Sequence, residues 1–417
     1  LVPPSFLIDK ALAQMRMSAK NARSGGSVVE SLGRRTKEKA IAGDWSARAR
    51  TIAQQEIAPA LDRQIAELEA QRKVATDDAG MWARPNGDEF YRWALRASTT
   101  TAMTPDEVHE MGQRELKELH AEMDTIMKGL GLTTGTVGER MKALAKDLKY
   151  MFAEGDKDRV TWIRAQLPRV FNTQVNPNME VKRLPPEEEP GAPTAYGGAG
   201  SIDGKIPGRY WINLRSTDLH SKFSLADLTF HESIPGHILQ GEFTRKMPII
   251  RQLLAFNAYS EGWALYAQQL AAELGAYEND PVGRLGYLQA IAFRACRLVV
   301  DTGLHAKRWT REQGVRFFVD VNGSNEMEVA SEVDRYCSWP GQACGYKVGH
   351  SEINRQREKA KAALGAKYDL KAFDDALVLG GNGQIAPPTL GKLARDRVEG
   401  RACAVRRNRG NVSSGPA

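Results

Sequence analysis

Helical periodicity is the feature that most limits how this chain can fold. It is clearest over residues 88–131, where Thr104 is an expected N-cap and Pro105 suits a first helical turn. Gly129 lies near the far end of the same helix. Between these signals, apolar residues recur every three to four positions, at Val108, Met111, Leu116, Leu119, Met123 and Met127. The spacing predicts a buried helix face, and similar segments over most of the chain predict a fold of packed helices.

One segment breaks the helical pattern and leads into the best strand candidate. Prolines, glycines and an acidic run over residues 184–208 exclude a regular element and predict a long loop. The next residues, RYWINL at 209–214, form a short aromatic and β-branched run, which is typical of a strand. We therefore expect a mainly α protein that carries a small β-sheet, with 209–214 as an edge strand that precedes the next helix.

Charge and composition divide the chain into three expected regions. These are a helical region over 1–183, a second region with the sheet and its helices over 184–391, and a tail over 392–417. The formal net charge is +7, but the tail holds seven Lys and Arg against two Asp and Glu, which leaves +2 for the rest. The nearly neutral body predicts no nucleic-acid partner, and the tail, which is rich in Gly and Ser, predicts a flexible end.

The start of the chain and its cysteines leave the compartment open. The chain begins LVPPSFLIDK, without Met or a signal-like apolar run, so we expect the N-terminal region to be incomplete at its start. No apolar run reaches the roughly 18 residues of a membrane span, and we expect a soluble protein, cytoplasmic or exported. Four cysteines are too few for a disulfide framework. Cys337 and Cys344 either pair or remain free core thiols.

The sequence TFHESIPGHILQ contains the parts of a helical zinc motif at an altered spacing. His231 and Glu232 are adjacent, as a zinc ligand and its general base are in helical metallohydrolases. The second imidazole, His237, is six residues from the first, which would place it about 120° off the same helix face. Pro235 and Gly236 lie between the two histidines and permit a kinked or bulged helix that would bring His237 back.

Glu261, in the segment YSEGWALYAQQL, is the candidate third ligand, because a catalytic zinc keeps three protein ligands and one open position. It follows His237 by 24 residues, enough to finish one helix and begin an antiparallel one, and we expect it in the turn before that second helix. We expect Ser224 to cap the motif helix, with Asp227 in a capping-box position. Spacing alone leaves two interpretations open: a metal site, or a structural histidine with surface acids.

The same residues resemble a widespread bacterial family, the domain of unknown function 885. The resemblance rests on HESIPGHILQ followed by YSEGWALYAQQL, and three further segments agree with the family: YRWALRASTTTAMTPDEVHEMGQ, GSIDGKIPGRYWINL and VASEVDRYCSWPGQACGYKVGHSEINRQREKAKAALG. Together they cover roughly residues 85–390. The family is regarded as metallopeptidase-like and similar in layout to the helical gluzincin peptidases. One departure is visible, since Phe373-Asp374 stands where the family pattern leads us to expect Phe-His.

The resemblance implies a helical metallopeptidase-like architecture and one Zn²⁺. By the same resemblance, His231, His237 and Glu261 would be the metal ligands and Glu232 the general base. An oxyanion would need a further donor, for which Tyr336, Tyr346 and His305 are the candidates. The alternative is that both tyrosines are core aromatics and that His305 is a plain buried histidine.

A peptide substrate would also need groups that hold its backbone and its charge. The strand 209–214, with Tyr210 and Asn213, could align a substrate as an added strand, unless it is an ordinary sheet strand. Arg335 and Lys347 are the candidate cations for a free substrate carboxylate, with structural salt bridges as the alternative.

Three functional hypotheses follow. The first is a zinc-dependent hydrolase of peptide or related amide bonds, acting on short peptides. The second is a metal-dependent hydrolase of a non-peptide amide, since ligands determine the chemistry and not the substrate. The third is a helical binding protein without turnover. The sequence leaves the substrate, exo- or endopeptidase action and the oligomeric state open.

Overall fold

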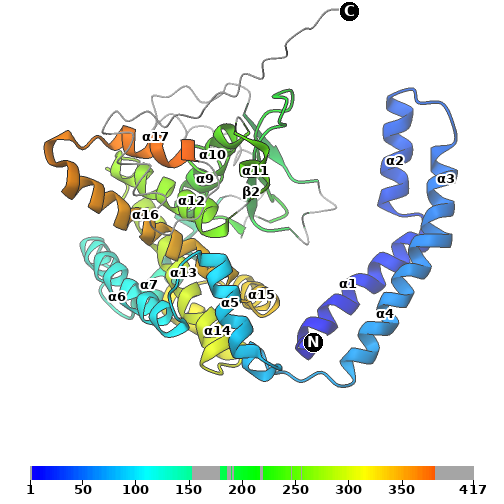
Figure 1. Cartoon of the computed structure of the whole chain (residues 1–417), viewed down its shortest axis with the longest axis horizontal. Coiled ribbons are helices and arrows are strands. Elements are labelled where there is room, and N and C mark those ends of the chain that lie inside the picture. The colour runs from blue at the N-terminus through cyan, green and yellow to red at the C-terminus, as the bar shows by residue number, and fades with distance from the viewer. Residues whose placement is uncertain are drawn as a thin grey trace, which may run out of the picture.

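The computed structural model describes residues 2–152, 179–185, 189, 192–216, 219–245, 247–254 and 256–380. It is mainly helical, as predicted, with one small sheet (Figure 1). The helices are α1 (Ser5–Ser24), α2 (Ser27–Glu38), α3 (Trp45–Ile52), α4 (Ala58–Arg72), α5 (Gly87–Thr99), α6 (Pro105–Gly129), α7 (Val137–Leu144), α9 (Lys222–Glu232), α10 (His237–Thr244), α11 (Ile249–Leu253), α12 (Asn257–Glu273), α13 (Pro281–Ala306), α14 (Arg311–Phe317), α15 (Glu326–Ser338), α16 (Gln342–Leu364) and α17 (Leu370–Gly380). The expected tail, 392–417, and Cys403 lie outside the described residues.

Helix α6 confirms the helix signals of the sequence. The Thr104 hydroxyl accepts a hydrogen bond from the backbone N–H of Glu107, and the Glu107 carboxylate accepts one from the backbone N–H of Thr104. This capping box sets the start of the helix, with Pro105 in its first turn. The buried side of α6, which includes Val108, Met123 and Met127, packs along α13.

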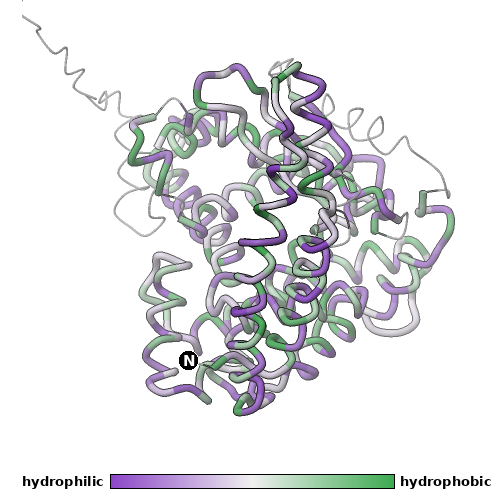
Figure 2. Tube along the Cα trace, turned by 90° about the vertical axis from the view of Figure 1, so that its right-hand side faces the viewer, coloured by the Kyte–Doolittle hydropathy of each residue, from purple (hydrophilic) through white to green (hydrophobic). Residues whose placement is uncertain are grey.

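Helix α13 forms the centre of the helical body. Nearly all of its residues between Val282 and His305 are buried, and α6, α9 and α16 pack around it. Figure 2 shows hydrophobic and hydrophilic residues alternating along many of the helices, as amphipathic helices require. The predicted boundary at 183/184 does not interrupt this core, because α6 precedes the boundary and α13 follows it.

Helices α12 and α16 pack extensively against each other, side by side. A Cβ on Gly262 would lie 2.6 Å from the carbonyl carbon of Gly349, so both positions need small residues. Gly345 faces Asn257 in the same way, one turn earlier on both helices. Because both contacts advance in the same direction along the two chains, α12 and α16 are parallel. On α12, Glu261 lies between the two contact positions, Asn257 and Gly262.

Helices α1 to α4 form an arm that extends to one side of the body (Figure 1). Within the arm α1 packs on α4. The start of α1 attaches to the body, where Phe6 and Leu7 contact the core cluster that contains Val333, and Lys10 pairs with Asp334 of α15.

The sheet has the order β1-β3-β2, with β1 (Glu180–Arg183) parallel and β2 (Ala195–Gly198) antiparallel to β3 (Arg209–Ile212). The prediction that 209–214 is an edge strand is therefore wrong: its residues form the central strand, because a strand pairs on each side of it. Among the described strands, β2 is the edge strand next to α9 and α10. It lies within 184–208, so the prediction that this segment holds no regular element is wrong there: AYGG pairs with β3 although its own strand signal is weak.

The three described cysteines, Cys296, Cys337 and Cys344, are free and buried, which selects core thiols over a Cys337–Cys344 bond. None of the described helices combines the length and apolar character that crossing a membrane requires.

Candidate metal centre

Helix α9 carries the first two residues of the motif and begins earlier than predicted. Its N-cap is Ser221, whose hydroxyl accepts a hydrogen bond from the backbone N–H of Ser224. The prediction of Ser224 as the cap is wrong by three residues, because either serine can provide the capping oxygen. Asp227 therefore takes no part in a capping box and lies buried inside the helix.

The Pro-Gly segment divides the motif between two helices instead of kinking one. Helix α9 ends at Glu232, and α10 begins at His237. A Cβ on Gly236 would lie 1.8 Å from the carbonyl oxygen of His231, so only glycine fits there. The indole N–H of Trp263, on α12, donates to the carbonyl of Pro235 at 2.9 Å and holds the turn. As a result, the two imidazole centroids are 4.9 Å apart.

Glu261 completes a group of three potential ligands. It lies inside α12, in the second turn, and not in the turn before the helix as predicted. Its Oε2 is 3.6 Å from Nε2 of His231 and 3.3 Å from Nε2 of His237, and the ligand atoms of all three residues lie within 4.8 Å of one another. This oxygen is buried and accepts no hydrogen bond from the residues that the structure describes, as expected of an atom that faces a common centre. Two imidazoles and a carboxylate match the ligand set of a catalytic zinc.

His237 and Glu261 shift each other's pKa in opposite directions. Burial lowers the pKa of His237, but the Glu261 carboxylate outweighs it and raises that pKa to about 9. Burial raises the pKa of Glu261, but His237 and His231 hold it well below the usual value. The carboxylate is therefore ionised and available as a ligand.

A chain of two buried side chains orients His231. Its Nδ1 lies 2.9 Å from Oε1 of Gln268, and the Gln268 amide N–H donates to Asp227. An amide oxygen only accepts, so Nδ1 of His231 carries the proton and Nε2 presents its lone pair to the centre. Gln268 could not be predicted from the sequence, although it lies in the segment that carries Glu261, because an amide side chain gives no ligand signal.

Glu232 lies beside this group and against the sheet. Its Oε1 is 4.0 Å from Nε2 of His231, and its Oε2 accepts a hydrogen bond of 2.6 Å from the backbone N–H of Gly197. Gly197 belongs to β2, and a Cβ there would lie 2.1 Å from the carbonyl oxygen of Glu232. The edge strand thus packs directly on the end of α9, and its amide fixes the carboxylate. No feature of the sequence pointed to Gly197.

Of the remaining predicted residues, Tyr210 and Tyr346 interact electrostatically with acidic residues of the site. Tyr210 is buried on β3, and its pKa is raised first by burial and then by the charge of Glu232. Tyr346 lies on α16 between Gly345 and Gly349, which face the turns of α12 on either side of Glu261. Its pKa is raised by burial and by the charge of Glu261.

His305 has a structural environment. Its Nδ1 accepts the backbone N–H of Met81 at 3.1 Å, so its Nε2–H donates to the carbonyl of Tyr336 at 3.1 Å. Asp301, four residues earlier on α13, forms no hydrogen bond with His305; it accepts from the Tyr91 hydroxyl and from the backbone N–H of Gly341. Both ring nitrogens of His305 are therefore engaged by backbone, which leaves neither for catalysis.

The other predicted residues are also held by structural contacts. Asn213 donates to the carbonyl of Glu189 at 2.8 Å. Lys347 is buried and pairs with Glu115. The Tyr336 hydroxyl donates to Glu332 at 2.9 Å, and Arg335 also pairs with Glu332, at 2.9 Å.

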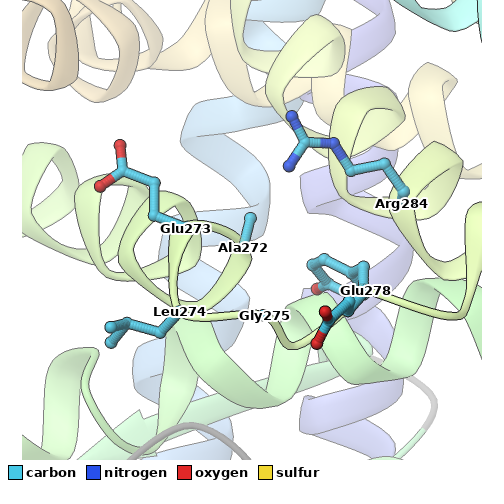
Figure 3. Close-up of a pocket in the computed structure, with 7 residues that line it drawn as sticks. Ala272, Glu273, Leu274, Gly275, Glu278 and Arg284 are labelled. Carbon is cyan, nitrogen blue, oxygen red and sulfur yellow. The ribbon is translucent and has the colours of Figure 1, made fainter.

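A surface pocket of about 480 Å³ lies away from this group (Figure 3). It is lined by Ala272, Glu273, Leu274, Gly275, Tyr277, Glu278 and Arg284. Glu273 follows Glu261 by twelve residues on the same helix, which is about 18 Å along its axis. The pocket is thus at the opposite end of α12 and has no part in the candidate centre.

Comparison with known proteins agrees with the motif. The family model described as a bacterial protein of unknown function, DUF885, matches residues 1–391. The chain belongs to the DUF885 family. A structure of a "putative lipoprotein" from Colwellia psychrerythraea is 35% identical, with a TM-score of 0.88 over 95% of this chain and 71% of that one. A structure of a "putative lipoprotein of unknown function" from Shewanella oneidensis is 21% identical, with a TM-score of 0.71 over 93% and 73%. No curated protein matches the chain.

Proposed function

We propose that this DUF885 protein is a zinc-dependent hydrolase of peptide or related amide bonds, with short peptides as substrates. The observation that carries the proposal is the convergence of His231, His237 and Glu261 from three helices, with ligand atoms within 4.8 Å of one another. A fourth residue, Glu232, lies beside them without being part of the group. This arrangement has the composition of a catalytic zinc site, which keeps one position open.

The residues of the chain divide the work as follows. When bound, zinc supplies Lewis acidity that makes water a nucleophile near neutral pH. Glu232 accepts the proton of that water and passes it to the leaving nitrogen, and the Gly197 amide holds the carboxylate in place for both transfers. Tyr346, whose pKa is raised by the charge of Glu261, would donate a hydrogen bond to the oxyanion.

The edge strand β2 favours an extended peptide among amide substrates. Its amide at Gly197 already faces the catalytic carboxylate, so a substrate strand along β2 would place its backbone beside Glu232. In this proposal β2, and not 209–214, aligns the peptide substrate as an added strand.

The descriptions of the two similar structures name no reaction. Both read "putative lipoprotein", and this likeness supports the proposal that the present protein is exported. Fractionation of the source cells tests this: the proposal expects the protein outside the cytoplasm, and recovery in the cytoplasmic fraction would contradict it.

The variant Glu232→Gln tests the hydrolase proposal. We expect it to lower turnover of a short-peptide mixture, followed by mass spectrometry, by roughly 10²- to 10⁴-fold, because the proton acceptor is lost. Zinc content should remain that of the parent. Glu242→Gln, which alters a carboxylate paired with Arg245 on α10, is the matched control and should keep its activity. Unchanged turnover in Glu232→Gln would refute the mechanism.

A further inference from the structure

Three arginines lie close together near the candidate centre, and the described residues offer them a single ion-pairing carboxylate. We call Arg294 and Arg297 of α13 and Arg335 of α15 the arginine cluster. Arg297 and Arg335 share one carboxylate, Glu332, at 2.8 Å and 2.9 Å. Arg294 forms no ion pair with any residue that the structure describes; its one hydrogen bond there goes to the carbonyl of Ala290, at 3.2 Å.

Among the residues that the structure describes, Glu332 is the one acid that forms ion pairs with the cluster. Burial opposes ionisation of Glu332, but Arg297 and Arg335 lower its pKa to about 2, so it carries one full charge. Burial and the neighbouring Glu332 raise the pKa of Glu328. Asp227 lies near Arg294, but its hydrogen bond comes from Gln268. The cluster thus combines three guanidinium groups with one paired carboxylate.

Within the described part of the chain, two N–H groups of the cluster are buried without an acceptor: Nη1 of Arg297 and Nε of Arg294. Arg297 is only 7% exposed, so water does not readily replace the missing acceptor. An unsatisfied buried donor on a charged group is unfavourable enough that native proteins rarely retain one. An anionic ligand would satisfy both donors.

The cluster adjoins the candidate metal centre through two contacts. The guanidinium carbon of Arg297 lies 4.2 Å from the ring centroid of Tyr346. Arg335 donates to the side chain of Gln342, which in turn bonds to Asn257, one turn before Glu261 on α12. Tyr346 thus contacts the arginine cluster and interacts electrostatically with Glu261.

We propose that the arginine cluster binds a carboxylate of the substrate while the amide bond lies at the metal centre. Guanidinium groups match carboxylates in shape and charge, and they keep their charge when buried. The proposal rests on the proposed hydrolase function and narrows it to substrates that carry a carboxylate near the cleaved bond. That carboxylate is either the C-terminus of a short peptide or an acidic side chain.

Three probes distinguish these sources: benzoyl-Gly-Phe with a free carboxylate, its C-terminal amide, and benzoyl-Gly-Glu-amide. We expect the zinc-loaded chain to cleave at least one carboxylate probe with a kcat/KM roughly 10- to 100-fold above that of the Phe amide. A preference for the first assigns the site to a C-terminus, and a preference for the third assigns it to an acidic side chain. Equal cleavage of all three would overturn the subsite and leave the hydrolase intact.

Substitutions locate the effect. Arg297→Met and Arg294→Met should each remove most of the preference, by raising KM for the carboxylate probe more than KM for the Phe amide. Arg294→Met breaks no ion pair within the described chain, so it serves if Arg297→Met does not fold. Arg284→Met, on the same helix but paired with Glu122, is the matched control and should keep the preference. Retained preference in a folded Arg294→Met variant would overturn the assignment.

A binding measurement separates the subsite from the reaction. Calorimetry with zinc-loaded Glu232→Gln should show tighter binding of a carboxylate probe than of the Phe amide, and Arg294→Met in that background should abolish the difference. If no probe is cleaved by the parent but this difference is found, the hydrolase proposal fails and the subsite stands. Equal binding of all three probes would overturn the subsite regardless of turnover.

Discussion

At the scale of single residues, Gln268 decides how His231 meets the candidate metal. Its amide oxygen accepts a hydrogen bond from Nδ1–H of His231, and its amide N–H donates to Asp227, so the lone pair of Nε2 faces Glu261. A hydrophobic side chain of similar size would leave the imidazole free to rotate and to change tautomer. The effect reaches the metal only through His231, so Gln268 is a positioning residue.

We therefore expect Gln268→Leu to weaken zinc binding by roughly 10- to 100-fold, measured by competition with a chelator of known affinity. The adjacent Gln269, which bonds to His350 and Asn354 on α16, provides the matched control. Gln269→Leu should bind zinc as the parent does. Equal affinities in Gln268→Leu and the parent would show that the amide has no positioning role.

At the scale of elements, the turn between α9 and α10 is what brings the two histidines together. The six-residue spacing fails in one continuous helix but succeeds in two helices joined at Gly236, because the second helix can take its own direction. The absence of a side chain at Gly236 is the condition for that turn, since a Cβ would meet the carbonyl of His231.

Gly236→Ala should displace α10 and lower both the zinc content and the free energy of unfolding, the latter by about 2–4 kcal/mol. Gly198→Ala is the control, because a Cβ on Gly198 meets no atom within 4 Å. The measurements are metal analysis and chemical unfolding. A stable Gly236→Ala variant with full zinc would contradict the role of the turn.

Helix α17 contacts the helical body through Asp374, a carboxyl group with a raised pKa. Asp374 accepts a hydrogen bond of 2.9 Å from Tyr266 of α12, and burial raises its pKa to about 7, against the opposing effects of Tyr266 and Arg357. The folded pKa is above the unfolded one, near 3.9. Asp374 therefore favours the folded state most below about pH 4, and this contribution falls as pH rises through about 7.

The change Asp374→Asn removes the titrating group and keeps its shape. We expect the stability difference between pH 5 and pH 8 to shrink by on the order of 2 kcal/mol, measured by chemical unfolding at each pH. Asp375→Asn, at the exposed neighbouring position, should leave the parent's difference unchanged. An unchanged difference in Asp374→Asn would mean that the carboxyl ionises normally in the folded protein.

At the scale of the whole molecule, the sequence predicted what depends on local or chemical pattern. The helical class and the start of α6 follow from periodicity and capping, which are local. The group of His231, His237 and Glu261 could be predicted because few residue types bind metals and the motif resembles that of the family. The actual N-cap of α9 could not, since two serines three residues apart offer the same oxygen.

The remaining errors concern contacts between distant segments. The central place of β3 depends on β1 and β2, whose sequences EVKR and AYGG give weak strand signals. His305 faces backbone atoms of Met81 and Tyr336, which no spacing in the sequence indicates. Arg335 was predicted as a cation for a substrate carboxylate, but its place beside Arg294 and Arg297 depends on how α15 packs against α13, which the sequence does not indicate.

Zinc analysis of the purified chain, beside His231→Ala, His237→Ala and Glu261→Ala, tests the central claim most directly. The three side chains come from α9, α10 and α12 and provide all the protein ligands that the proposed site requires. We predict about one zinc per parent chain after reconstitution and dialysis, and little zinc in each folded variant. A folded parent that retains no zinc, or variants that keep the zinc of the parent, would contradict the metal centre and the hydrolase that depends on it.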